Sequence, residues 1–155
     1  MELLNGPSLT HILNLTSDCK RELSILTRGA RYASWPESLE RNLVTLAKKG
    51  VKVRILFEGR ARRDSAREER LRKAGVQLLS TPLFASIIRS SELLNFEIWI
   101  SDRSEILFLN ERGHLSRQEH ANSPIIRLLL GPEAAEGLGS YFESRWKMGA
   151  ALLDY

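Results

Sequence analysis

Apolar residues recur along the first half of the chain in two alternating patterns: helix-face spacing and short continuous runs. Residues 8–19 carry leucine and isoleucine near helical spacing, and an apolar run follows at 22–27. This helix-then-strand order repeats twice more before residue 82, and crossover helices of this kind predict parallel strands. The predicted helices are 8–19, 34–49 and 64–74, and the predicted strands are 22–27, 51–57 and 76–80.

The second half of the chain has a different pattern. Two apolar runs, 93–101 and 105–110, are separated by Asp102-Arg103-Ser104, which indicates a hairpin turn. The elements predicted after it are a polar loop at 111–122, a strand at 125–130 and a helix from 132 to about 147. We therefore predict a single α/β domain over 1–155, with a mixed, mostly parallel sheet and helices on both faces.

Several residues are typical of helix ends. Ser34 followed by Glu37 has the spacing of a capping box, which predicts the start of the second helix. Gly50 and Gly75 follow the second and third helices, where glycine ends a helix in the left-handed conformation.

Composition narrows the class of protein. The chain has 155 residues, 43% hydrophobic and 27% charged, which suits one domain with a buried core. No apolar run approaches the roughly 20 residues of a membrane span, and the N-terminus lacks the features of a signal peptide. The single cysteine, Cys19, excludes an internal disulfide, so we expect a cytoplasmic protein. No glycine-rich phosphate loop is present, and we predict no cofactor.

Basic residues concentrate in one segment. Residues 60–73 hold seven basic and three acidic groups, and this difference, 7 − 3 = +4, equals the net charge of the whole chain. Because the segment directly follows a predicted parallel strand, it lies at the sheet edge where ligands of α/β proteins bind. The candidate anion- or nucleic-acid-binding residues are Arg62, Arg63, Arg67 and Arg70. The alternative is a solvated face balanced by its own acids, since no aromatic residue falls between 58 and 80.

Three segments, in a constant order, carry a resemblance to a known family. The first is 48–56, an amphipathic helix end running into a Gly-Val-Lys-Val-Arg-Ile-Leu strand. The second is 95–102, and the third combines 122–124, 131–135 and 141–146. Over residues 8–148 these segments resemble one half of the phospholipase D superfamily, whose signature is His-x-Lys-x-x-x-x-Asp.

The signature is degenerate in this chain. Asn95 stands where the resemblance puts the nucleophilic histidine, Glu97 where it puts the phosphate-binding lysine, and Asp102 alone matches. Asparagine is not a useful nucleophile, and a glutamate repels phosphate where the reaction needs positive charge. The resemblance therefore implies a phospholipase D-like domain that is not an enzyme. The alternative is an ordinary strand, with Phe96, Ile98 and Ile100 on one face and Asn95, Glu97 and Trp99 on the other.

The domain is also similar to the effector domain of archaeal TrmB-type transcriptional regulators. In that family a DNA-binding domain precedes the effector domain, and Met1 leaves no room for one here. We therefore expect an isolated regulatory domain, or a protein that acts through a DNA-binding partner or fused domain. The resemblance implies a homodimer, and a pocket of Asn95, Glu97, Asp102 and Arg60 that binds a polar small-molecule effector or a protein partner.

Two alternatives from other functional classes remain open. One is a phosphodiesterase or nuclease with an unconventional site, for which His114 and His120 are the candidate nucleophiles. These histidines also have a glutamate between them, but no third strong zinc ligand accompanies them, so exposed loop positions are favoured. The other is a nucleic-acid or anionic-surface binder that uses the basic segment 60–73, with an affinity that falls steeply with salt.

Overall fold

The computed structural model describes most of the chain: residues 2–4, 8–28, 32, 34–58, 65–81, 96–110, 125–129 and 131–153. The helices are α1 (Ser8–Asp18), α3 (Glu37–Lys48), α4 (Ser65–Ala74) and α7 (Pro132–Leu153). The strands are β1 (Glu2–Leu4), β2 (Glu22–Arg28), β3 (Lys52–Glu58), β4 (Gln77–Thr81), β5 (Phe96–Ser101), β6 (Glu105–Asn110) and β7 (Ile125–Leu129).

The described strands form one mixed sheet in the order β1-β7-β6-β5-β2-β3-β4. β2, β3 and β4 run parallel, whereas β5, β6, β7 and β1 form antiparallel pairs on the other side of β2. The predicted mixed α/β sheet is confirmed, but parallel pairing predominates only in the half formed by β2, β3 and β4. The tight turn between β5 and β6 explains the difference, because a short hairpin can join only antiparallel neighbours.

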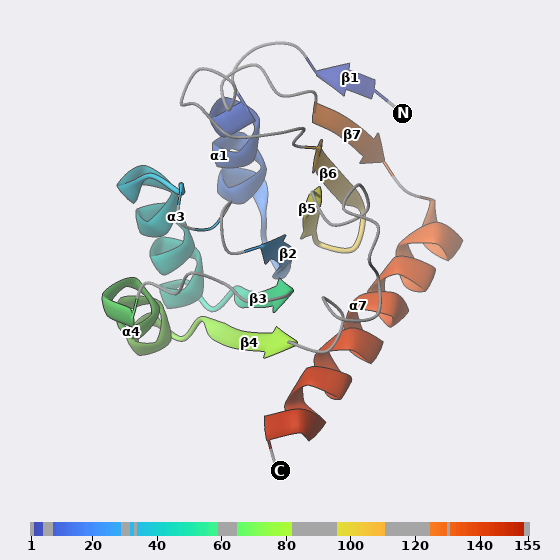
Figure 1. The fold of residues 1–155 in the computed structure, drawn as a ribbon. Helices are drawn as coiled ribbons and strands as arrows, with labels where there is room; N and C mark the ends of the chain where they lie inside the picture. Colours follow the sequence, from blue (N-terminus) through green and yellow to red (C-terminus); the bar gives the residue numbers. More distant parts are fainter. Residues whose placement is uncertain are drawn as a thin grey trace.

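Helices cover both faces of this sheet, as predicted. α1, α3 and α4 lie on one face, and α7 crosses the other (Figure 1). Alternate residues of each strand pack on opposite faces, since successive strand side chains point to opposite sides. The core on the first face includes Ile12, Leu39, Leu43, Leu71, Leu23, Ile25, Ile55, Phe57 and Trp99. The smaller core beneath α7 consists of Leu26, Leu56, Leu79, Ile100, Ile106 and Phe142.

The predicted helix ends are partly confirmed. Gly50 and Gly75 have φ angles of 90° and 102°, which glycine adopts without strain. The next residue in each turn, Val51 or Val76, donates its N–H back to a carbonyl five residues earlier, closing the helix. The predicted serine cap of α3 is wrong: its N-cap is Pro36, with no side-chain capping bond, because the helix starts only at Glu37.

A buried ion pair joins α7 to the sheet. Arg54 of β3 is 3% exposed, and its guanidinium lies 2.6 Å from the Glu143 carboxylate on α7. The same guanidinium lies 4.9 Å from the ring centroid of Phe142 and 5.5 Å from that of Trp146. α7 ends at Leu153, beyond the predicted end near residue 147. None of the described helices has the length and apolar character needed to cross a membrane.

Candidate functional site

β5 holds the described part of the degenerate signature, in antiparallel register with β2 and β6. Ile98 pairs with Leu26 of β2, and Trp99 pairs with Ile25. Glu97 and Trp99 therefore face α1, α3 and α4, while Ile98 and Ile100 face α7. This placement confirms the predicted alternation of the strand.

The Glu97 carboxylate is a buried hydrogen-bond acceptor, and the residue is 1% exposed. Thr27 Oγ1 of β2 donates to Oε2 at 2.5 Å, and Trp35 Nε1 donates to the same oxygen at 3.2 Å. Trp99 Nε1 donates to Oε1 at 2.7 Å. A buried carboxylate is tolerated only when donors replace its lost hydration, and these three groups provide that replacement. We call Thr27, Trp35, Glu97 and Trp99 the carboxylate cage.

An aromatic cluster surrounds the carboxylate cage. Trp35 lies 5.3 Å from Trp99 and 5.1 Å from Tyr32 between ring centroids, and Tyr32 lies 4.8 Å from Phe57. All four rings are buried, and the two contacts of Tyr32 are edge-to-face. Such contacts fix ring orientation, so the two indole N–H groups are preorganised to point at Glu97.

Arg67 of α4 supports this cluster from outside. Its Nη1 donates to the Tyr32 carbonyl at 3.0 Å and its Nη2 donates to the Trp35 carbonyl at 2.7 Å. The guanidinium also lies 5.4 Å from the Tyr32 ring centroid, and Arg67 is 8% exposed. The sequence predicts that Arg67 binds an anion, whereas in the fold its guanidinium holds the segment that presents Trp35.

Glu40 of α3 is the acidic partner of two arginines of α4. Its Oε1 accepts hydrogen bonds from Arg70 Nη2 at 2.9 Å and Nε at 3.1 Å, and lies 3.6 Å from Arg67 Nε. The Arg70 side chain remains 56% exposed, in contrast to that of Arg67. Of the four candidate anion-binding arginines, the two that the structure describes, Arg67 and Arg70, therefore make internal ionic contacts.

Asp102 lies in the hairpin turn between β5 and β6. Asp102 and Arg103 have φ angles of 52° and 55°, the left-handed pair expected of a tight hairpin. The Asp102 carboxylate accepts backbone N–H bonds from Lys20 at 2.9 Å, Arg21 at 2.7 Å and Glu22 at 3.0 Å. Burial opposes ionisation, but these N–H groups outweigh it and hold the pKa of Asp102 below its ordinary value. The carboxylate thus ties the turn to the start of β2.

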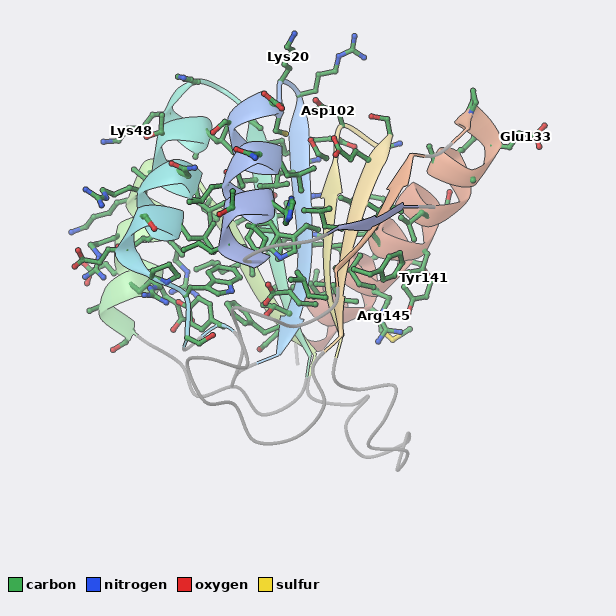
Figure 2. All side chains as sticks on the ribbon, turned by 90° about the horizontal axis from the view of Figure 1, so that it is seen from above. Lys20, Lys48, Asp102, Glu133, Tyr141 and Arg145 are labelled. Atoms are coloured by element: carbon green, nitrogen blue, oxygen red, sulfur yellow. The ribbon has the colours of Figure 1, made fainter. Side chains whose placement is uncertain are left out.

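The structure separates two residues that the sequence analysis grouped in one pocket. Glu97 is near the start of β5 and beside the end of β2, whereas Asp102 follows β5 and bonds to the start of β2. Five residues of strand span roughly 17 Å, so the two carboxylates lie at opposite ends of the sheet. Figure 2 shows Asp102 beside Lys20 at one end of the strands. Asn95, Arg60, Arg62, Arg63, His114 and His120 lie outside the described residues.

No sequence pattern pointed to the cage residues Thr27 and Trp35. Trp99 carried a usable signal, because it lies two residues after Glu97 on the same strand face. Thr27 and Trp35 are 70 and 62 residues away from Glu97, and no local pattern connects them. Among the described residues, no group of three histidine, cysteine, aspartate or glutamate side chains is arranged to hold a metal ion.

The fold resembles known structures, although no known family model and no curated protein matches the sequence. The structure of Nuc from Salmonella typhimurium, a phospholipase D family member, matches with a TM-score of 0.70 at 18% identity. That match covers 96% of this chain and 95% of Nuc. The chain has a phospholipase D-like fold.

Two further solved structures share the phospholipase D-like fold. NucT from Helicobacter pylori matches with a TM-score of 0.64 at 12% identity, over 94% of each chain. The archaeal chromatin protein TrmBL2, whose structure shows a mode of DNA binding, matches with a TM-score of 0.63 at 16% identity. This match covers 95% of this chain and 52% of TrmBL2, so the chain spans about half of that protein. The predicted resemblance to TrmB-type proteins is thereby confirmed at the level of fold.

Proposed function

We propose that this phospholipase D-like domain is a non-catalytic binding module with a regulatory role. The observation that carries the proposal is the carboxylate cage. Glu97 stands where the resemblance puts a phosphate-binding lysine, and its carboxylate is held by Thr27, Trp35 and Trp99. A carboxyl group held at this position by the surrounding protein presents oxygen acceptors where a phosphodiester would need a cation.

The chemistry of phosphoryl transfer supports the same conclusion. Charge accumulates on the phosphoryl oxygens in the transition state, and an enzyme stabilises it with preorganised cations or N–H donors. Here two indole N–H groups point at Glu97 and are not available to a substrate. Asn95, at the expected nucleophile position, carries an amide with no useful nucleophilicity.

The ligand site in this proposal lies at the carboxyl ends of β2, β3 and β4. Glu97 marks that end through its bond to Thr27, and ligands of open α/β sheets bind there. Asn95 and Arg60 remain the proposed ligand contacts, and a site with an amide and a guanidinium would suit a hydroxyl-rich or zwitterionic small molecule. Asp102 is left out of this pocket, because its carboxylate bonds to backbone N–H groups at the other end of the sheet.

A hydrolysis assay tests the absence of catalysis. We expect no turnover of bis-p-nitrophenyl phosphate or of DNA above the buffer rate, for the wild type and for His114→Ala and His120→Ala. Hydrolysis that one of these histidine variants abolishes would instead establish the unconventional phosphodiesterase. The exposed Asn14→Ala serves as a control for effects of substitution as such.

Native mass spectrometry of the purified protein tests the binding role. We expect a dimer that retains a small molecule, and loss of that molecule in Asn95→Ala and Arg60→Ala but not in Asn14→Ala. A bare monomer would contradict both the paired domain and the pocket. The structural likeness to TrmBL2 supports a role beside DNA, supplied by a DNA-binding partner or fused domain.

A further inference from the structure

Exposed cations gather at the end of the sheet opposite the carboxylate cage. They lie in or beside the turns that lead into β2, β3 and β4, and Figure 2 shows Lys20 and Lys48 at this end. The backbone N–H of Lys52 donates to the Arg21 carbonyl at 3.0 Å, which joins two of these turns. We call the following six residues the basic edge: Lys20, Arg21, Lys48, Lys49, Lys52 and Arg72.

The acids near the basic edge compensate only part of its charge. Glu22 is engaged by Arg103, whereas Asp18 and Asp102 remain beside the turn before β2, so the six cations exceed these two acids by 6 − 2 = +4. Within the described ranges, none of the six cations forms an ion pair, although Lys52 acts on Glu143 at longer range. Lys73, by contrast, pairs with Glu69 at 3.1 Å.

Helix stabilisation explains only part of this arrangement. Lys48 and Arg72 lie in the last turns of α3 and α4, where a cation interacts favourably with the helix dipole. Lys20, Arg21 and Lys52 lie outside the helices, so the dipole does not account for them. Exposed like charges placed together repel one another, and a polyanionic partner relieves that repulsion.

The exposed side chains around the basic edge indicate which kind of polyanion it binds. Membrane-surface proteins combine cations with apolar anchors, and single-strand binders combine them with stacking aromatics. The exposed large apolar side chains of the described residues are Tyr141 and Met148, both on α7 and not on the basic edge. We propose that the basic edge binds the phosphate backbone of a double-stranded nucleic acid, without reading its sequence.

This inference is independent of the proposed function. The basic edge lies where the parallel strands begin, and the carboxylate cage lies where they end. Loss of duplex binding would therefore leave the ligand pocket and the absence of hydrolysis untouched, and the reverse also holds.

Fluorescence anisotropy with a short labelled duplex DNA tests the proposal. The test variant is Lys20→Glu/Lys49→Glu, and its matched control is Arg41→Glu/Lys147→Glu, which reverses two exposed cations elsewhere. Each reversal changes the charge by −2, so both variants change the net charge of +4 to zero. We expect the test variant to lose at least about tenfold in affinity and the control less than about threefold. If four of the six cations contact phosphates, the affinity should also fall on the order of 100-fold between about 50 and 200 mM salt.

Several outcomes would overturn the proposal. These are an absence of duplex binding, equal losses in the two variants, or an equal loss in Arg62→Glu/Arg63→Glu. Binding to phosphatidylserine vesicles without binding to the duplex would assign the basic edge to a membrane surface instead. Circular dichroism verifies folding, and the milder Lys20→Gln/Lys49→Gln replaces the test variant if the charge reversal unfolds the protein.

Discussion

The indole N–H of Trp99 donates a 2.7 Å hydrogen bond to the carboxylate of Glu97, two residues earlier on the same face of β5. Thr27 and Trp35, from distant parts of the chain, also donate hydrogen bonds to this carboxylate. The position that the phospholipase D resemblance assigns to a lysine therefore contains an acid that accepts hydrogen bonds from the surrounding protein. A lysine at this position would need different surroundings as well as a different side chain.

Glu97→Lys should destabilise the protein by roughly 3 to 5 kcal/mol, because a buried ammonium would face two indole N–H groups that cannot accept a hydrogen bond. Glu97→Gln should cost about 1 to 3 kcal/mol, since one amide oxygen replaces two carboxylate oxygens. Urea unfolding measures both changes. Glu136→Lys, an exposed substitution of the same kind on α7, is the control and should change stability by less than about 0.5 kcal/mol. A folded Glu97→Lys variant as stable as the wild type would disprove the buried-acceptor role.

Asp102→Asn should reduce stability at neutral pH by about 1 to 2 kcal/mol, because the neutral amide oxygen accepts the three backbone N–H groups more weakly. Asparagine tolerates the left-handed backbone of this turn, so the substitution adds little strain. The folded-state pKa of Asp102 lies below its ordinary value of 3.8, so the ionised group stabilises the fold above that value. The contribution is lost as the pH falls through the folded-state pKa.

The difference in unfolding free energy between wild type and Asp102→Asn should therefore be constant from about pH 5 to 8 and shrink below about pH 4. Unfolding curves at a series of pH values test this, with the exposed Asp18→Asn as the comparison. A difference that grows on acidification has the wrong sign and would count against the proposed role of the carboxylate.

Glu143→Ala should cost more stability than Arg54→Met. The Arg54 side chain is 4% exposed and would keep a buried charge without its partner, whereas Glu143 is 30% exposed and regains water. We expect about 3 kcal/mol for Glu143→Ala and about 1 kcal/mol for Arg54→Met, which keeps apolar packing against Phe142 and Trp146. Urea unfolding measures the two changes, with Glu136→Ala on the same helix as control; equal costs would refute the asymmetry.

Arg67→Lys should loosen the segment that carries Trp35, because one ammonium cannot bridge the two carbonyls that the guanidinium fork contacts. We expect a loss of about 1 to 2 kcal/mol and a red shift of tryptophan emission as Trp35 meets water. Arg70→Lys is the matched control: the Arg70 side chain is 56% exposed and its guanidinium binds the Glu40 carboxylate, so the cost should stay below about 0.5 kcal/mol. Equal effects of the two substitutions would place Arg67 among ordinary surface arginines.

The order of helices and strands was predictable because it depends on local patterns. The hairpin strands at β5 and β6, the stops at Gly50 and Gly75, and the helices on both faces all follow from periodicity and turn residues. β1 was missed because three residues carry no periodic signal. The balance of parallel and antiparallel pairs was also missed, since it depends on which strands become neighbours.

The sequence by itself determined the chemical identity of the candidate site: an amide and a carboxylate stand where the resemblance expects an imidazole and an ammonium. Only the tertiary structure decided what the carboxylate does. Strand register and helix packing bring Thr27 and Trp35 within hydrogen-bond distance of Glu97. They also place the buried Arg67 guanidinium against the Trp35 carbonyl. Side chains 62 and 70 residues apart meet through packing of the whole sheet and its helices, which no local pattern records.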